Sequence, residues 1–141
     1  HAPLPESHIH AMPVEDPDLD EAARTYGRVL EAIAGTPPVL DLVHLGLGAD
    51  GHTASLVPGD ASLQVVDRDV AVTGLYQKRL RMTLTYPVIN RARRILWVAT
   101  GPEKAEMLAR LQAGDRSIPA GGIRRDVAQV LADAAAVGRN T

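Results

Sequence analysis

The chain has 141 residues, of which 45% are apolar and 23% charged, a composition typical of one globular domain over residues 1–141. Its 15 basic and 17 acidic residues leave a net charge of −2, which excludes a strong attraction to nucleic acid or to an anionic membrane. Cysteine is absent, which excludes disulfides, thiolate metal sites and thiol nucleophiles, and the longest apolar run, residues 95–99, is too short to span a membrane, so we expect a cytoplasmic protein.

The first regular element that the sequence predicts is an amphipathic helix. Asp16 followed by a proline is typical of a helix start, and Gly35 with the prolines after it ends the helix. Between them the apolar residues recur at helical spacing, at Leu19, Ala22, Ala23, Tyr26, Val29, Leu30 and Ile33. Residues 1–15, rich in proline and histidine, show no such period, and we expect them to form a loop-like lead segment.

Strands are predicted at five places. Two continuous apolar segments, residues 40–46 and 95–100, are expected to be buried on both faces. Residues 65–72 form a weaker strand candidate and residues 127–131 a last strand. Residues 80–85 alternate, which places Leu80, Met82 and Leu84 on one face and Arg81, Thr83 and Thr85 on the other.

Helices are predicted between these strands. A short helical segment is expected after His52, before Pro58-Gly59, and Thr85-Tyr86-Pro87 is typical of another helix start. A further helix runs from Thr100 through Leu111 and is stopped by Gly114. Strands that alternate with helices indicate an α/β fold with a parallel sheet covered on both faces.

The turn after the first strand contains the first candidate site. Gly46, Gly48 and Gly51 allow backbone conformations closed to other residues, and His52 follows at once. A helix N-terminus at His52 would favour the neutral imidazole that a general base needs, whereas Asp50 favours the charged ring and could orient it. The alternative is a tight turn with a capping aspartate and a surface histidine.

Two basic residues are candidates for binding an anion. Lys104 lies in the first turn of a predicted helix, where a cation is unfavourable unless an anion binds there too, although Glu103 and solvent could equally screen it. Arg81 shares a strand face with Thr83 and Thr85, and a basic residue in such a polar row suits a sugar phosphate. The alternative for Arg81, which Arg79 precedes, is an edge strand protected by charge.

Other histidine and serine residues are weaker candidates. His8 and His10 could chelate a metal, but no third ligand of matching spacing accompanies them in the lead segment, and no metal site is predicted. His44 lies inside a predicted buried strand and is expected to be a hydrogen-bonded core residue. Ser55 lacks the Gly-x-Ser-x-Gly pattern of serine hydrolases, so we do not expect it to be a nucleophile.

The glycine turn closely resembles the signature of the 6-phosphogluconolactonase family, over the run Leu-Gly-Leu-Gly-Ala-Asp-Gly-His-Thr-Ala-Ser-Leu-Val-Pro-Gly at residues 45–59. Three further blocks resemble the family in order and approximate spacing, Arg-Met-Thr-Leu-Thr at 81–85, Thr-Gly-x-x-Lys-Ala at 100–105 and Ser-Ile-Pro-Ala at 117–120. Together they cover most of residues 20–133. The resemblance implies an α/β parallel-sheet sandwich of the amino-sugar deaminase and ribose-5-phosphate isomerase type.

The resemblance also implies a reaction, the hydrolysis of 6-phospho-D-glucono-1,5-lactone to 6-phosphogluconate in the pentose phosphate pathway, without a metal or an organic cofactor. In this reading His52 is the general acid/base and Asp50 supports its imidazole. Backbone N–H groups of the glycine turn, with Gly48 and Gly51 as the substrate-binding residues, receive the developing oxyanion. Arg81 and Lys104 hold substrate charge.

The chain departs from the family in one respect, because nothing in it resembles the N-terminal part, which carries a glycine-rich phosphate loop. It also opens on His1 with no initiator methionine, so we expect a C-terminal portion that contacts the missing segment or another chain. One alternative function is a non-catalytic sugar-phosphate-binding fragment. Another is an amino-sugar-phosphate deaminase, for which residues 55–58 lack the carboxylate that follows the turn in that branch.

Overall fold

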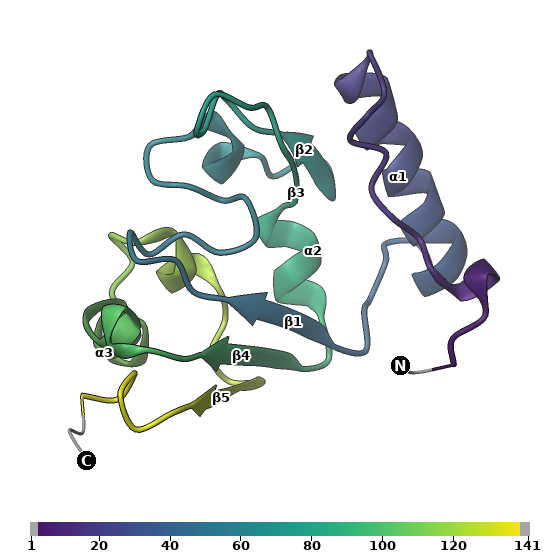
Figure 1. Ribbon diagram of the computed structural model, residues 1–141. Coiled ribbons are helices and arrows are strands. Elements are labelled where there is room, and N and C mark those ends of the chain that lie inside the picture. Colours follow the sequence, from purple (N-terminus) through teal and green to yellow (C-terminus); the bar gives the residue numbers. More distant parts are fainter. Residues whose placement is uncertain (1–2, 139–141) are drawn as a thin grey trace.

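The computed structural model describes residues 3–138 and shows an α/β protein (Figure 1). Its helices and strands, in chain order, are α1 (Leu19–Ala34), β1 (Val43–Gly46), β2 (Val70–Val72), β3 (Met82–Leu84), α2 (Tyr86–Arg91), β4 (Ile95–Ala99), α3 (Ala105–Ala113) and β5 (Ala128–Ala132). Four 3₁₀ turns accompany them, η1 (Glu6–His8), η2 (Ala61–Gln64), η3 (Pro102–Lys104) and η4 (Pro119–Gly122). Among residues 3–138, none of the helices has the length and apolar character needed to cross a membrane.

A parallel sheet of three strands forms the centre of the fold, in the order β1-β4-β5, which confirms the predicted fold class. Gly46 at the end of β1 lies opposite Val98 of β4, so the carboxyl ends of the two strands meet at one edge of the sheet. Strands β2 and β3 stand apart from it as an antiparallel pair. The edge where β1 and β4 end is the place where ligands bind in parallel α/β sheets.

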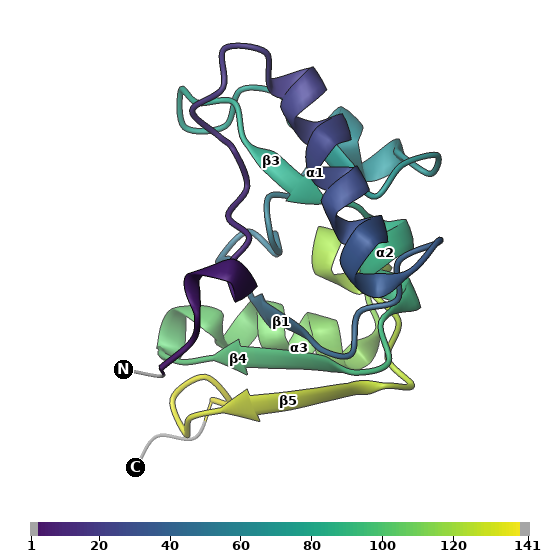
Figure 2. The ribbon, with the colours of Figure 1, turned by 90° about the vertical axis from the view of Figure 1, so that its right-hand side faces the viewer.

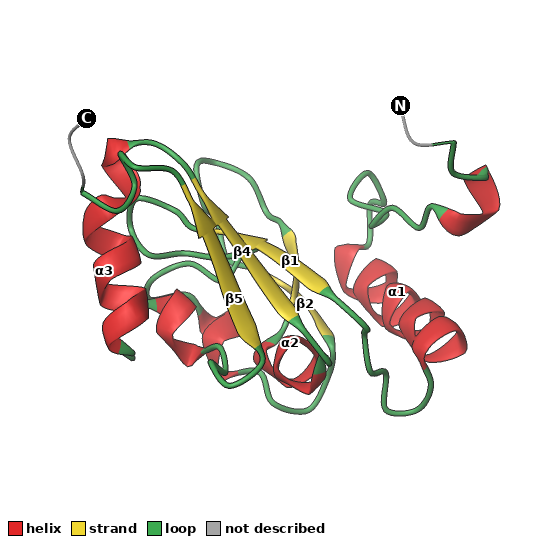
Figure 3. Cartoon of the chain, turned by 90° about the horizontal axis from the view of Figure 1, so that it is seen from below, coloured by secondary structure: helices red, strands yellow, loops and turns green. Residues whose placement is uncertain are grey.

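Strands β1 and β4 are buried on one face and β5 is exposed along most of its length, so the prediction that the strands are buried on both faces is wrong. Along β1 and β4 the buried residues alternate with more exposed ones, since Val43, Leu45, Ile95, Trp97 and Ala99 are buried and belong to one core cluster. That cluster includes residues of α2, α3 and η4, and Figure 3 shows α2 and α3 together on one side of the sheet.

The opposite face of the sheet carries apolar side chains that are exposed. Val98 is 37% exposed and Leu131 58%, and Leu42, just before β1, is 54% exposed. The apolar pattern of these strands indicates burial on both faces, but within residues 3–138 no element covers the second one. His44 also lies on this face and is exposed, so the prediction of a core histidine is wrong.

Helix α1 packs on the antiparallel pair, where Ala22, Ala23 and Leu30 meet Val70 and Met82 in a second core cluster (Figure 2). The partly buried Leu40 and Leu84 pack against both clusters, which joins the two parts of the fold.

Helix α1 begins two residues later than predicted. The cap is Asp18, whose carboxylate accepts the backbone N–H of Glu21 at 3.0 Å, whereas Asp16 accepts the N–H of Asp18. The helix ends at Gly35, as predicted, with a φ of 88°.

The later elements agree more closely with the sequence. Helix α2 follows Thr85 as its N-cap, and α3 ends at Gly114, which has a left-handed φ of 75°. The first turn of the predicted helix after Thr100 is the 3₁₀ turn η3, and α3 continues from it. Strands β2 and β3 are shorter than the predicted strands, and β5 is shifted by one residue toward the C-terminus.

Candidate active site

The glycine turn after β1 closes on itself through backbone hydrogen bonds. The N–H of Gly48 donates to the carbonyl of His52 at 2.8 Å, and the N–H of Gly51 donates to the carbonyl of Gly48 at 3.0 Å. Gly51 has a φ of 81°, a conformation that favours glycine. The amides of both glycines are therefore used within the turn.

The helix predicted after His52 is absent, because the chain makes a tight reverse turn there instead. Thr53 and Leu56 form an isolated antiparallel bridge, and Ala54 between them has a left-handed φ of 50°. The fully buried hydroxyl of Thr53 donates to the carbonyl of Gly46 at 2.9 Å, which ties the turn to the end of β1. His52 therefore does not lie at a helix N-terminus, and the prediction that a helix dipole acts on it is wrong.

His52 and Asp50 are in direct contact. Nδ1 of His52 lies 2.5 Å from Oδ1 of Asp50, and the same oxygen accepts the backbone N–H of His52 at 3.1 Å. Burial acts to raise the pKa of Asp50, but the hydrogen bonds from the backbone and ring of His52, the charge of that ring and the hydroxyl of Tyr76 outweigh it and lower this pKa. Asp50 is thus a carboxylate, which only accepts hydrogen bonds, so Nδ1 carries the proton and Nε2 is the basic nitrogen.

The two glycines beside this pair leave room for neighbouring side chains. A Cβ at Gly48 would overlap Nδ1 of His52 and lie 2.7 Å from Oδ1 of Asp50. A Cβ at Gly51 would lie 2.7 Å from Cβ of Ile118, and the carbonyl of Gly51 accepts the N–H of Ala120 at 3.0 Å. The segment around residues 117–120 therefore supports the turn from behind.

Lys104 and His52 line the same cavity, of about 360 Å³, together with Gly46, Leu47, Gly48, Ala49 and Ala54. They meet because β1 and β4 are parallel, so that the turn after β1 and the 3₁₀ turn after β4 lie at one edge of the sheet. Among the residues that the structure describes, no carboxylate lies within 4.0 Å of the Lys104 ammonium. The cavity therefore has a cation available for an anionic ligand.

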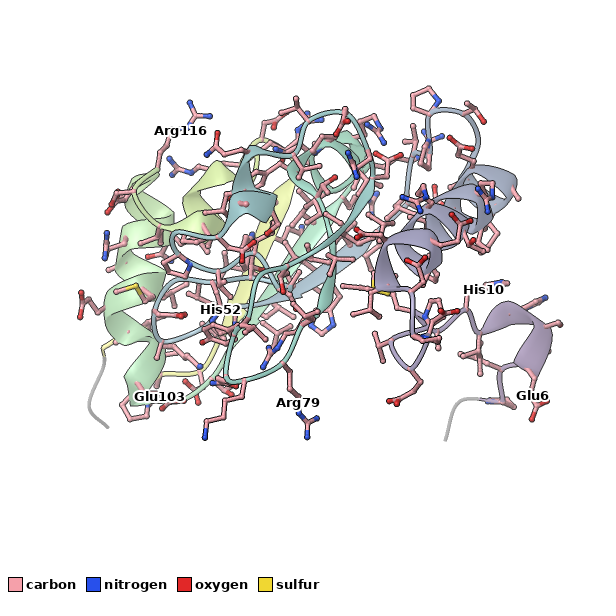
Figure 4. All side chains as sticks on the ribbon, turned by 90° about the horizontal axis from the view of Figure 1, so that it is seen from above. Glu6, His10, His52, Arg79, Glu103 and Arg116 are labelled. Carbon is pink, nitrogen blue, oxygen red and sulfur yellow. The ribbon has the colours of Figure 1, made fainter. Side chains whose placement is uncertain are left out.

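Arg81 is not among the residues that line this cavity. Its guanidinium lies over the ring of Tyr76, 4.9 Å from the centroid, and donates to Oε1 of Gln77 at 2.9 Å. Tyr76 connects Arg81 to the pair of Asp50 and His52, since its hydroxyl donates to Oδ2 of Asp50 at 3.2 Å. Arg79, in contrast, points outward (Figure 4).

The polar row predicted beside Arg81 does not face a ligand. Thr83 and Thr85 are 1% and 0% exposed, and their hydroxyls bond within the protein. The Thr83 hydroxyl accepts the N–H of Ser55 at 3.1 Å, and the Thr85 hydroxyl donates to the carbonyl of Arg68 at 2.7 Å. The row therefore holds loops in place on the inside of the fold.

The histidines of the lead segment lie away from this site. His8 and His10 are exposed, and Figure 4 shows His52 in the body of the α/β unit and His10 on the N-terminal segment. Within residues 3–138 no group of three or more histidine or carboxylate side chains is placed to hold a metal ion.

Comparisons with known proteins identify the family of this chain. The model of the family described as glucosamine-6-phosphate isomerases/6-phosphogluconolactonase matches residues 1–132. The 6-phosphogluconolactonase of Synechocystis is 41% identical over 114 residues, which are 78% of this chain and 47% of that protein. The human 6-phosphogluconolactonase is 43% identical over 113 residues, which are 77% of this chain and 43% of that protein. The chain thus spans about half the length of these relatives.

Solved structures show the same fold. The crystal structure of the devB protein has a TM-score of 0.85 and 28% identity to this chain, and the match covers 96% of this chain and 60% of that one. The 6-phosphogluconolactonase of Thermotoga maritima has a TM-score of 0.78 and 27% identity, covering 92% and 57%. The extent of the family match, together with the identity to these relatives, shows that the chain belongs to the family of glucosamine-6-phosphate isomerases and 6-phosphogluconolactonases.

Proposed function

We propose that the protein to which these residues belong hydrolyses 6-phospho-D-glucono-1,5-lactone to 6-phosphogluconate, the lactonase step of the pentose phosphate pathway. The observation that carries the proposal is the contact of 2.5 Å between Nδ1 of His52 and Asp50, which leaves Nε2 as a base beside a cavity that contains Lys104. The names of the similar proteins support the substrate, since both the Synechocystis and the human relative are 6-phosphogluconolactonases.

In the proposed mechanism His52 acts first as a base and then as an acid. Nε2 takes a proton from water as the water oxygen attacks the lactone carbonyl carbon. The tetrahedral intermediate then collapses, the bond between that carbon and the ring oxygen breaks, and the imidazolium returns the proton to the departing oxygen. Asp50 stabilises the imidazolium through the hydrogen bond to Nδ1. His52 thereby ends each cycle in its starting state.

The remaining site residues have supporting roles in this proposal. Lys104 binds the phosphate from the cavity wall, and Arg81 contributes positive charge from the neighbouring hairpin. Because the amides of Gly48 and Gly51 already donate within the turn, they are not available to stabilise the oxyanion. Their role in the proposal is steric, because they let the turn hold the His52 ring against Asp50.

The other functions considered have less support. An amino-sugar deaminase needs a carboxylate after the turn, whereas residues 55–58 offer none and Leu56 there is fully buried.

We also propose that these residues are the C-terminal portion of a longer protein. The rest of that protein, or another chain, would then contact the exposed apolar face of the sheet. The cytoplasmic location remains a prediction, to be checked by cell fractionation.

The proposal is tested by measuring lactone hydrolysis by the full-length protein and its His52→Ala variant. We expect the variant to lose about 10²-fold or more in kcat, the usual scale for a positioned acid/base group. His10→Ala is the matched control, since its side chain is exposed on the lead segment. A His52→Ala variant that folds correctly and keeps kcat within about threefold of wild type would sink the assignment. The same assay on residues 1–141 alone determines whether this part is sufficient.

A further inference from the structure

A β-hairpin beside the catalytic pair holds one aromatic residue, Tyr76, in a fixed place. Tyr76 and Arg79 exchange backbone hydrogen bonds of 3.0 and 3.1 Å around a two-residue turn, in which Gln77 and Lys78 have φ values of 50° and 64°. Below the turn, the N–H of Thr73 donates to the carbonyl of Arg81 at 2.8 Å. The hairpin thus has the tight geometry of a primed turn, and Tyr76 stands at its first position.

A second anchor ties the hairpin to the body of the protein. Gly74, two residues before Tyr76, donates its N–H to Oδ2 of Asp60 at 2.8 Å. The other oxygen of Asp60 accepts the N–H of Ser62 and caps the 3₁₀ turn η2. The hairpin is therefore held at its base as well as at its turn, so Tyr76 can hold other groups in place.

Tyr76 contacts both halves of the candidate site. Its hydroxyl donates to Oδ2 of Asp50 at 3.2 Å, and its ring meets the His52 ring edge-on with centroids 5.8 Å apart. On another side its ring carries the Arg81 guanidinium at 4.9 Å. One side chain therefore joins the pair of Asp50 and His52 to the guanidinium of Arg81, for which the proposed function gives a role in substrate binding.

The bond to Asp50 fixes the plane of that carboxylate. The χ2 torsion of an aspartate is soft, so a single hydrogen bond leaves the carboxylate free to rotate. Here Oδ1 accepts from both the ring and the backbone N–H of His52, whereas Oδ2 accepts from Tyr76, so the bond from Tyr76 is the one that fixes the second oxygen and with it the plane. Burial and the negative charge of Asp50 raise the pKa of Tyr76, although Arg81 opposes this, so the phenol remains a hydrogen-bond donor at neutral pH.

We propose that Tyr76 is a positioning residue of this site, whose hydroxyl acts on His52 through Asp50 and whose ring holds Arg81 in place. This inference rests on the proposed function for its kinetic consequences, but the contacts can be tested without it. It predicts separate effects for the two parts of the side chain, since phenylalanine removes the hydroxyl and keeps the ring, whereas leucine removes both.

The kinetic test compares Tyr76→Phe and Tyr76→Leu in the full-length protein, with 6-phosphogluconolactone and glucono-1,5-lactone as substrates. We expect Tyr76→Phe to lower kcat about tenfold on both with little change in KM, the scale of one hydrogen bond to a charged group. Tyr76→Leu should in addition raise KM for the phosphorylated lactone alone. Tyr26→Phe is the matched control, because its hydroxyl donates to the backbone carbonyl of His10 on the lead segment.

A double-mutant cycle separates positioning from a general structural effect. If Tyr76 acts through Asp50, adding Tyr76→Phe to Asp50→Asn changes kcat by less than about twofold, since the acceptor is already altered. An equal loss in both backgrounds would overturn the inference, and so would a Tyr76→Phe variant with wild-type kcat.

An NMR experiment tests the inference even if the protein is inactive on the lactone. Such inactivity would overturn only the proposed function. The Nδ1–H proton of His52 is followed by NMR in the wild type, Tyr76→Phe and Tyr26→Phe. We expect its exchange with water to be several-fold faster in Tyr76→Phe alone, because Asp50 can then rotate away. An unchanged resonance and exchange rate in Tyr76→Phe would show that Tyr76 does not position the pair.

Discussion

The backbone N–H of Ser55 donates to Oγ1 of Thr83 at 3.1 Å, and this bond joins the turn that carries His52 to strand β3. Thr83 is 1% exposed, and its hydroxyl donates in turn to the carbonyl of Leu84 at 2.9 Å. A buried N–H that loses its partner costs about 1–3 kcal/mol. The contact therefore contributes to stability as well as to the position of the turn.

Replacing this threonine tests that contribution. Thr83→Val keeps the shape of the side chain but leaves the Ser55 N–H without its acceptor, so the free energy of unfolding should fall by about 1–3 kcal/mol in urea denaturation. Thr25→Val, on the exposed face of α1, is the control and should change it by about 0.5 kcal/mol or less. Similar values for the two variants would contradict the role given to Thr83.

Gly48→Ala should impair catalysis more than any loss of stability explains. The added Cβ would overlap Nδ1 of His52, so the ring must leave Asp50, and we expect kcat to fall about tenfold or more. Gly27→Ala in α1 meets nothing within 4 Å and should keep full activity while stabilising the protein by about 1 kcal/mol. Steady-state kinetics at saturation decides this, and full activity of Gly48→Ala would show that the ring does not need this position.

Lys104→Ala should chiefly raise KM for the phosphorylated lactone. The ammonium lines the cavity beside His52, and a contact to phosphate contributes to binding in both the ground state and the transition state. The effect on glucono-1,5-lactone, which has no phosphate, should be much smaller. Equal losses on both substrates would show that Lys104 has a structural role instead.

The loop after α3 should be sensitive to acid. Hydrogen bonds from the side chain and backbone of Ser117, together with Arg110, lower the pKa of Asp115 from its ordinary value of 3.8 to about 2. As the pH falls, Asp115 is protonated in the unfolded chain before it is protonated in the folded protein. Its contribution to the free energy of unfolding is therefore complete above about pH 4 and is lost as the pH falls toward 2. Urea midpoints measured across this pH range should fall less steeply in the Asp115→Asn variant than in the wild type. Equal dependence of the midpoint on pH in the two proteins would contradict this role of Asp115.

Chelators should leave the activity of the full-length protein unchanged. The proposed mechanism needs only imidazole, a carboxylate and water, and Nδ1 of His52 is already engaged by Asp50. Dialysis against EDTA followed by the lactone assay checks this, with a mock-dialysed sample as the control. An activity that is lost on dialysis and restored by a divalent ion would require a different mechanism.

The features predicted well from the sequence depend on neighbouring residues. Gly114 ends α3 and Thr85 stands at the N-cap position of α2, because such signals act within one turn. The pair of Asp50 and His52 was visible for the same reason, since the two are only two residues apart. In contrast, the exposure of Val98 could not be predicted, because an apolar residue in a strand does not reveal what covers it.

Tyr76 contacts both Asp50 and His52 but was not predicted from the sequence, and a physical reason explains why. Hairpins are usually recognised from glycine or asparagine in the turn, but here Gln77 and Lys78 adopt the left-handed conformations. The contact with Asp50 also joins positions 26 residues apart, which no local period reports. The helix expected after His52 failed similarly, because the hydroxyl of Thr53 bonds to Gly46 in a reverse turn.

The division of the core into two clusters bears on how the protein would fail on heating. Proteins open in contiguous cooperative units, and α1 packs with the antiparallel pair in a cluster of its own, linked to the other cluster through Leu40 and Leu84. If α1 and the antiparallel pair melt first, the hairpin loses the strands from which it extends and the turn that carries His52 loses its bond to Thr83, while the parallel sheet remains. Inactivation would then precede the cooperative melting of the sheet, so the temperature at which activity is lost would lie below the calorimetric transition.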